Sequence, residues 1–141
     1  LILDYVIDAN ILMGMLISGK SSYKTLLDYY NFILPDFALV EIDKYKATIY
    51  KKSKLSNYQL RTFAYQIFSK ITFIPEFILT EEAKQKAVTL TSNIDIKDTA
   101  YVALALQLDL VLLSRDKPLV KGLKKKGFRK VQLFDEFLNS I

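Results

Sequence analysis

The sequence contains no cysteine and no histidine. Without cysteine, the chain can form neither a disulfide framework nor a thiolate metal site, and this composition fits a reducing compartment such as the cytoplasm. Without histidine, imidazole acid–base catalysis and ordinary zinc ligation are excluded as well. Any catalytic chemistry therefore has to come from carboxylates.

Long apolar runs are also absent. No stretch approaches the roughly 20 residues that a membrane span needs, so we expect no membrane association. The 141 residues suit a single domain covering residues 1–141, and an apolar content of 51% is enough for its core. With 20 basic and 15 acidic side chains, the net charge of +5 modestly favours polyanionic partners.

Short apolar runs alternate with helical patterns along the chain, and this alternation predicts a single α/β domain. The predicted strands cover Leu3–Ile7, Asn31–Leu34, Thr72–Pro75, Asp109–Leu113 and Val131–Phe134. The predicted helices cover residues 11–16, 22–30, 37–52, 57–71, 80–90 and 99–106, followed by a short helix at the C-terminal end. The first of these helices is expected to stop near Gly14 or Gly19.

The C-terminal third contains an acid, a helix, a strand and a second acid in close succession. Asp98 precedes Thr99–Leu106, a segment too apolar on all sides for a surface helix, so we expect this helix to lie inside the domain. The apolar run Asp109–Leu113 is typical of a parallel strand covered on both faces. Asp116 then leaves the carboxyl end of that strand, where open parallel sheets bind their ligands.

Two further acids lie in informative positions. Asp8 follows the first predicted strand directly, so it also reaches the carboxyl edge of the sheet. Glu41 lies on one helical stripe with Phe37 and Tyr45, which places a carboxylate on a largely apolar face. Because carboxylates are seldom buried without a partner, Glu41 is the hardest of these acids to explain as a surface charge.

Four acids would repel one another if they were gathered without a cation. Hard oxygen ligands of this kind suit Mg²⁺ or Mn²⁺. Such a site activates a water and holds a phosphodiester, and where two metals bind they lie roughly 3.5–4 Å apart. The residues thus favour a metal-dependent phosphodiesterase reaction.

Four segments resemble the motifs of PIN-domain nucleases. Val6–Asn10, with the sequence VIDAN, is similar to the opening of those proteins, and Val40–Ile42 lies where they carry a helical glutamate. Lys97–Ala105 resembles the helix of the third acid in toxin-type (VapC-like) members, and Ser114–Leu119 resembles the segment of the fourth. The segments occur in the same order over almost the whole chain.

This resemblance implies a three-layer α/β/α fold with a central parallel sheet, and a Mg²⁺- or Mn²⁺-dependent endoribonuclease. By position, the catalytic and metal-binding residues would be Asp8, Glu41, Asp98 and Asp116. Asn10 and Ser114 would give polar support. Asp95 adds an acid three residues before Asp98 and competes with it for the third position. We choose Asp98, because the apolar helix is in phase with it.

Simpler interpretations remain open for several of these residues. Asp98 is also a natural helix N-cap, and Asp8 and Asp116 alone would more often be solvated turn residues. The basic run between residues 117 and 130 is either a solvated face or a phosphate-binding surface, as is the cluster between residues 44 and 54. The cations predicted to bind nucleic acid are Lys44, Arg115, Lys117 and Lys121.

The resemblance also implies partners, namely an RNA substrate, a second copy of the chain and an antitoxin protein. We expect the contact surface on the apolar faces of two helices, around Tyr23, Leu27, Tyr30, Leu60, Phe63 and Ile67. One alternative function is an inactive PIN-like module that binds RNA or another protein. Another is a phosphoacceptor receiver domain, which Lys117-Pro118 superficially favours, although the third predicted strand ends without an aspartate.

Overall fold

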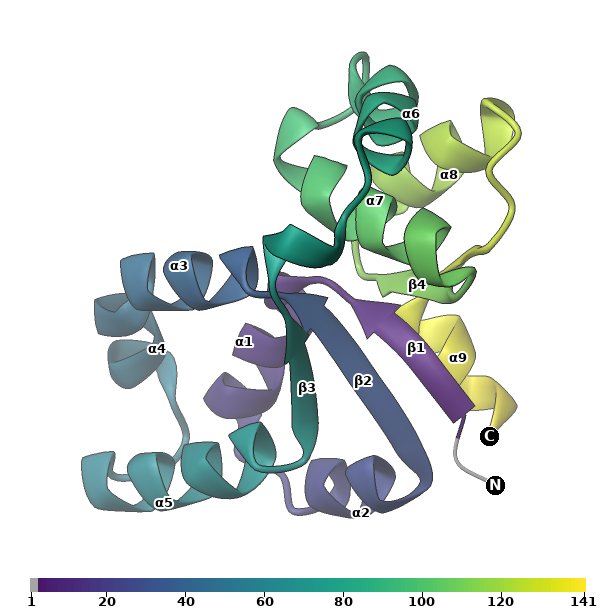
Figure 1. Ribbon diagram of the computed structural model, residues 1–141. Helices are drawn as coiled ribbons and strands as arrows, with labels where there is room; N and C mark the ends of the chain where they lie inside the picture. The colour runs from purple at the N-terminus through teal and green to yellow at the C-terminus, as the bar shows by residue number, and fades with distance from the viewer. Residues whose placement is uncertain (1–2) are drawn as a thin grey trace.

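A single parallel sheet forms the centre of the molecule (Figure 1). The computed structural model describes residues 3–141, so the first two residues of the predicted domain lie outside it. The strands are β1 (Leu3–Ile7), β2 (Tyr30–Pro35), β3 (Ile71–Ile74), β4 (Val111–Ser114) and β5 (Val131–Leu133). Their order across the sheet is β3-β2-β1-β4-β5, and all neighbouring pairs are parallel.

Nine α-helices connect and follow the strands in this part of the chain. They are α1 (Ala9–Ser18), α2 (Ser22–Tyr29), α3 (Phe37–Lys44), α4 (Lys46–Lys52), α5 (Asn57–Phe68), α6 (Glu81–Thr91), α7 (Thr99–Leu108), α8 (Lys117–Lys125) and α9 (Phe134–Ser140). Two short 3₁₀ helices, η1 (Glu76–Ile78) and η2 (Ile96–Asp98), precede α6 and α7.

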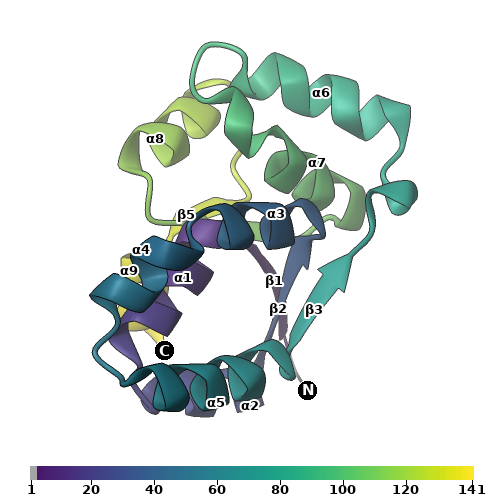
Figure 2. The same ribbon diagram turned by 90° about the vertical axis from the view of Figure 1, so that its left-hand side faces the viewer.

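The helices cover both faces of the sheet. On one face α7 packs on the strands, with α6 outside it and α8 beside it (Figure 1). On the other face lie α1, α2, α5 and α9, and α3 and α4 extend this layer (Figure 2). The predicted three-layer α/β/α fold with a central parallel sheet is confirmed.

Helix α7 is the most deeply buried helix element near the site. Its residues from Tyr101 to Ala105 are at most 2% exposed, and it contacts β1, β2 and β4. This burial explains why the segment is apolar on every side and confirms that it lies inside the domain. The N-terminal end of α7 is thereby fixed above the carboxyl edge of the sheet.

Strand β1 lies in the middle of the sheet. The chain passes from β1 to β2 and β3 on one side, and later crosses to β4 and β5 on the other. The carboxyl ends of β1 and β4 therefore meet where the direction of winding reverses, which is where doubly wound sheets bind ligands. The order also differs from the 2-1-3-4-5 order of receiver-type sheets, so the receiver interpretation is wrong.

Two helix predictions need correction. The single helix predicted from Phe37 to Lys52 is wrong, because the chain leaves helical geometry at Tyr45, between α3 and α4. The break lets α4 pack on α1 and bury Ile49. The basic run after Asp116, in turn, contains the unpredicted helix α8, which buries its few apolar side chains Leu119, Val120 and Leu123.

The partner surface predicted on α2 and α5 is wrong for the four of its six residues that are buried, whereas Tyr23 and Tyr30 are half-buried and stay a prediction. These two helices pack against each other, and Leu27, Leu60, Phe63 and Ile67 are at most 7% exposed within the core. Their helical periodicity therefore reflects packing inside the chain. Separately, no helix among residues 3–141 is both long and apolar enough to cross a membrane.

Gly19 allows a close helix ending that an alanine would disturb. It ends α1 at a φ of 63°, and an added Cβ would lie 2.6 Å from Leu55 Cγ. We expect Gly19→Ala to lower the free energy of unfolding by about 2 kcal/mol or more, from backbone strain and overpacking together. Gly127→Ala is the control, because Gly127 has a φ of 94° but no described atom within 4 Å of the added Cβ. Urea unfolding of both variants should show the larger loss for Gly19→Ala, and equal losses would contradict the predicted clash.

Candidate active site

Two of the predicted acids begin helices at the switch point of the sheet. Asp8 directly follows β1 and caps α1, because its Oδ1 accepts a 3.0 Å hydrogen bond from the Ile11 amide. Asp116 follows β4 and caps α8 in the same way, with Oδ1 3.0 Å from the Leu119 amide. Both side chains are thus held by a capping bond. The interpretation as a solvated turn residue is wrong for Asp8, which is buried, whereas Asp116 is half-buried.

Ser114 connects these two acids. Its buried hydroxyl donates a 2.7 Å hydrogen bond to Asp8 Oδ2 and accepts a 3.0 Å bond from the Asp116 amide. The parallel pairing of β1 with β4 brings the three residues together across more than a hundred positions of sequence. Ser114 therefore lies where the resemblance implies a supporting residue. Its support of the reaction stays a prediction.

Asp8 is the most deeply buried acid of the group, with 4% of its surface exposed. Loss of water raises the pKa of its carboxyl, and the hydrogen bond from Ser114 is the largest opposing influence. The charges of Glu41 and Asp116 raise the pKa further. This electrostatic coupling shows that Asp8, Glu41 and Asp116 lie within range of one another.

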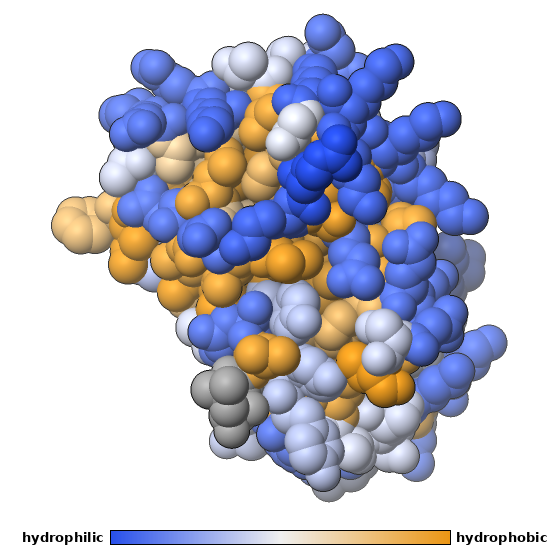
Figure 3. Space-filling model, turned by 90° about the vertical axis from the view of Figure 1, so that its right-hand side faces the viewer, coloured by the Kyte–Doolittle hydropathy of each residue, from blue (hydrophilic) through white to orange (hydrophobic). Residues whose placement is uncertain are grey.

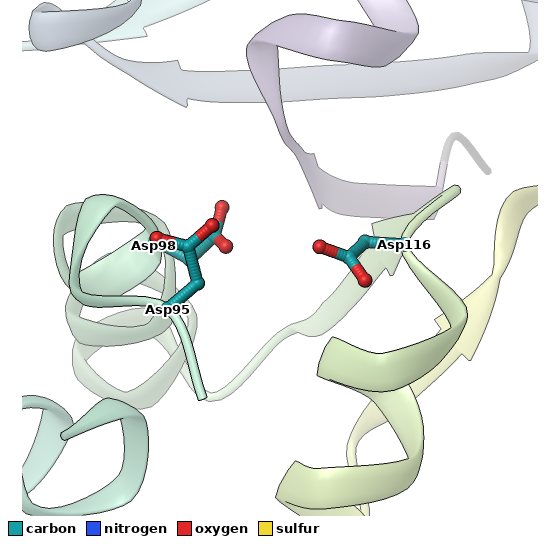
Figure 4. Close-up of side chains that lie close together, drawn as sticks. All are labelled: Asp95, Asp98 and Asp116. Atoms are coloured by element: carbon teal, nitrogen blue, oxygen red, sulfur yellow. The ribbon is translucent and has the colours of Figure 1, made fainter. Parts of the chain in front are cut away.

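Asp95 and Asp98 approach from the opposite side, through η2 and the start of α7 (Figure 4). Together with Asp116, each offers a carboxylate oxygen, and these oxygens all lie within 4.8 Å of one another. The η2 turn is held by a 3.0 Å hydrogen bond from the Lys97 amide to Asp95 Oδ1. The choice between Asp95 and Asp98 was therefore unnecessary, because both face Asp116.

Asp98 does not act as the helix cap that its position suggests. In the described chain its side chain accepts no capping hydrogen bond. Burial raises the pKa of its carboxyl to about 7, and repulsion from Asp95, the next largest cause, and from the other three acids adds to the effect. The side chain is directed toward other carboxylates at a cost in free energy, which favours the ligand interpretation over the cap.

Glu41 joins the site from α3 and is oriented by a tyrosine. The buried Tyr101 of α7 donates a short hydrogen bond to Glu41 Oε1. Burial is the main cause that raises the pKa of Tyr101, so its hydroxyl remains protonated and able to donate. The partner that Glu41 required is therefore Tyr101, which the sequence interpretation missed. The available signal was a lone tyrosine three residues after Asp98 in an otherwise apolar helix.

One cavity of about 440 Å³ brings these residues together. Its lining includes all four predicted catalytic acids, Asp95 and Asn10, so the structure gathers them although they are dispersed in sequence. It also includes Tyr45, Thr48 and Lys97, which the sequence interpretation did not select. Lys97 is the cation of this lining, and it directly precedes Asp98 in the same motif.

The predicted nucleic-acid-binding cations lie elsewhere. The described lining of the cavity includes none of Lys44, Arg115, Lys117 and Lys121. Arg115 packs against α1 at Gly14, lies 5.2 Å over the Phe134 ring, and donates a 3.4 Å bond to Tyr23. Lys44 lies over the ring of Tyr45, which does line the cavity.

The basic side chains of α8 point outward. Lys117 and Lys121 are exposed, and hydrophilic residues predominate at the upper right of the face in Figure 3, beside an apolar area. They extend from the helix that Asp116 caps, so a polyanion at the cavity could continue over them. Their role in binding RNA stays a prediction.

Fold and site together define a class of protein. A doubly wound parallel sheet with five carboxylates at its switch point is an α/β protein with a site suited to a divalent cation. The PIN domain family model matches residues 6–135, and the chain belongs to this family. The members of this family are generally nucleases, and they typically use divalent metals.

A solved structure agrees with this fold. The crystal structure of PAE2754 from Pyrobaculum aerophilum superposes with a TM-score of 0.64, covering 98% of this chain and 88% of that one, at 11% sequence identity. At this identity the similarity concerns the fold alone. No curated protein matches the sequence.

The donor set fits a divalent metal. It offers carboxylate oxygens within 4.8 Å of one another, and the raised pKa values of Asp8 and Asp98 show that the charges of these two acids are incompletely compensated by the protein. Hard dications prefer such oxygen ligands, whereas soft metals would require sulfur or imidazole. The ligands at hand would be Asp95, Asp98 and Asp116, with Asp8 and Glu41 beside them.

The raised pKa of Asp98 predicts how the stability of the metal-free protein depends on pH. Because the folded-state pKa of about 7 exceeds the ordinary value of 3.8, this contribution to stability is complete at low pH and is lost as the pH rises through about 7. Asp8 acts in the same direction. The stability advantage of Asp98→Asn over the parent should therefore grow as the pH rises. We expect it to be larger at about pH 8 than at about pH 5 by on the order of 2 kcal/mol.

Urea unfolding in a chelator at both pH values measures this gain. Asp43→Asn is the control, because Asp43 is exposed on α3, and its curve should run parallel to that of the parent. If the Asp98→Asn curve also runs parallel to the parent, Asp98 does not experience the repulsion described here.

Tyr101→Phe tests the orientation of Glu41. Removing the hydroxyl leaves the Glu41 carboxylate without its donor, so we expect a weaker response of the melting temperature to Mn²⁺ and a loss of about 10- to 100-fold in metal affinity. Calorimetric titration with Mn²⁺ gives the affinity. Tyr65→Phe is the matched control, because Tyr65 is 77% exposed, and its affinity should equal that of the parent. Equal Mn²⁺ affinity in both variants would show that Tyr101 packs in the core without orienting Glu41 for metal binding.

Proposed function

We propose that this protein is a Mg²⁺- or Mn²⁺-dependent endoribonuclease that hydrolyses RNA phosphodiester bonds. The observation that carries the proposal is the group of carboxylate oxygens from Asp95, Asp98 and Asp116 within 4.8 Å, at the switch point of a PIN domain. The absence of histidine and cysteine leaves carboxylates as the groups available for this chemistry.

The acids and their supports have separable roles in this proposal. Asp95, Asp98 and Asp116 would hold the metal, with Asp8 and Glu41 completing the set of donors. A bound divalent metal supplies an activated water and stabilises charge on the phosphate oxygens. The hydroxyl of Ser114 donates to Asp8, and the hydroxyl of Tyr101 donates to Glu41. Both carboxylates are therefore already oriented before a ligand binds.

Lys97 is the residue best placed to attract the substrate. A cavity of five carboxylates repels a phosphate backbone, and Lys97 contributes a positive charge to its lining. Its backbone is fixed by the bond between its amide and Asp95, which also orients that acid. A phosphodiester that approaches along Lys97 arrives beside Asp98 and Asp116.

The toxin role, the antitoxin partner, the homodimer and the cytoplasmic location stay predictions of the resemblance and the composition. They are part of this proposal only as its biological setting. Of the surface first assigned to the partners, this proposal keeps only Tyr23 and Tyr30, because the other four residues lie in the core. Co-expression with the gene product of the adjacent reading frame, followed by a cleavage assay, tests the antitoxin.

Cleavage of a structured RNA by purified protein tests the proposed activity. We expect cutting in Mg²⁺ or Mn²⁺, none in EDTA, and a loss of about 100-fold or more in Asp98→Asn and Asp116→Asn, since even supporting residues of metal sites contribute 10- to 100-fold. In Asp116→Asn the amide oxygen still caps α8, so the fold should persist.

Matched controls distinguish the loss of an acid in the cavity from the loss of a negative charge elsewhere on the protein. Asp28→Asn and Asp43→Asn remove exposed acids outside the cavity and should cleave like the parent. Full cutting in EDTA would eliminate the metal-dependent reaction. A parent that binds RNA but never cleaves it would favour the inactive RNA-binding module.

A further inference from the structure

A second cavity opens beside the acidic one, on the other side of the start of α7. Its volume is about 370 Å³, and its walls come from the end of β2 and from α3, η1, α6, η2 and α7. Phe37, Ile96 and Ala100 give it an apolar surface, and Phe37 and Ile96 are 41% and 65% exposed. The bases of single-stranded nucleic acids stack on accessible apolar and aromatic surfaces of this kind.

Lys97 lines both cavities. The second cavity also contains Lys84, but Lys84 is paired with Glu76 at 3.4 Å and with Glu81 at 3.6 Å. By contrast, Lys97 forms no ion pair within residues 3–141. The one cation not already paired in this region therefore lies on the border between the acids and the apolar pocket.

We propose that the second cavity binds the base of an unpaired nucleotide next to the phosphate that is cut. This inference rests on the proposed ribonuclease function and adds to it the pocket that holds the base beside the cut. In this arrangement Lys97 contacts the phosphate backbone where the strand passes from one cavity to the other. Phe37 and Ile96 contact the face of the base, which has to be unstacked from its neighbours to enter.

The charge at this border favours a nucleic acid over a second copy of the chain as the occupant. An apolar contact with a second copy would remove the charge of Lys97 from water at a cost, whereas a strand requires a cation at the point where its phosphate enters the acidic cavity. The two cavities share Lys97 in their linings, so a strand that leaves one of them at Lys97 is at the border of the other.

A fluorescent base reports on this pocket without any need for cleavage. Short single-stranded RNAs with 2-aminopurine at successive positions are mixed with the Asp116→Asn protein in Mg²⁺, so that the strand stays intact. We expect strong quenching at one position only, next to the cut that the parent makes. Adding Phe37→Ala should remove this quenching and weaken binding about tenfold, as alanine substitution at a stacking residue does.

Phe77→Ala is the matched control, because Phe77 is 96% exposed nearby but does not line the pocket. It should leave quenching unchanged and affinity within about twofold of the starting value. Lys97→Gln should weaken the binding of all the RNAs alike and reduce the salt dependence of binding by about one phosphate contact. Lys86→Gln, on the exposed side of α6, should change neither. If Phe37→Ala unfolds, Ile96→Ala, at a well-exposed position, gives the same test.

The outcomes separate this inference from the proposed function. If quenching depends on Phe37 but the parent protein never cuts RNA, the base-binding pocket is supported and the proposed ribonuclease activity is contradicted. Cutting by the parent with no quenching, or with quenching unaffected by Phe37→Ala, overturns the pocket alone. A dimer of the RNA-free protein that Phe37→Ala converts to a monomer also overturns it, because a second copy then covers this face.

Discussion

The parallel pairing of β1 with β4 is the constraint on which the whole site depends. It brings the carboxyl ends of two strands from opposite ends of the chain into one edge, and Ser114 fixes the result by bonding both Asp8 and the Asp116 amide. Every other part of the site is arranged around this edge. The η2 turn adds Asp98, α7 adds Tyr101, and α3 adds Glu41.

The site stores unfavourable electrostatic energy. Burial and mutual repulsion raise the pKa values of Asp8 and Asp98, so the protein holds carboxylates where their charged forms are disfavoured. The core under them tolerates this cost because it is continuous and apolar, from β1 through α7. Stability and the ability to bind a cation are thus set by the same residues, as is common at functional sites.

The sequence was sufficient for the strands, the parallel α/β class and the four spaced acids, because strand ends and acidic positions follow local rules. It did not reveal the break at Tyr45, because the apolar period continues across it while the turn depends on packing between α4 and α1. Tyr101 and Lys97 were missed because their roles arise from neighbours distant in sequence or across a cavity. Most of the predicted α2–α5 surface is buried, and the sequence did not reveal this because helical periodicity does not say what covers a face.

The way Asp116 begins α8 has a consequence for descent within the family. One of its oxygens serves the helix by accepting from the Leu119 amide, while the carboxylate faces Asp95 and Asp98. A gene copy that acquired asparagine here would lose the charge and keep the helix start, because asparagine caps equally well. Such a copy would keep the shape of a PIN domain without the full set of acids. Its metal-free stability would be equal to or higher than that of the parent, because a charge that raises the pKa values of Asp8 and Asp98 would be gone.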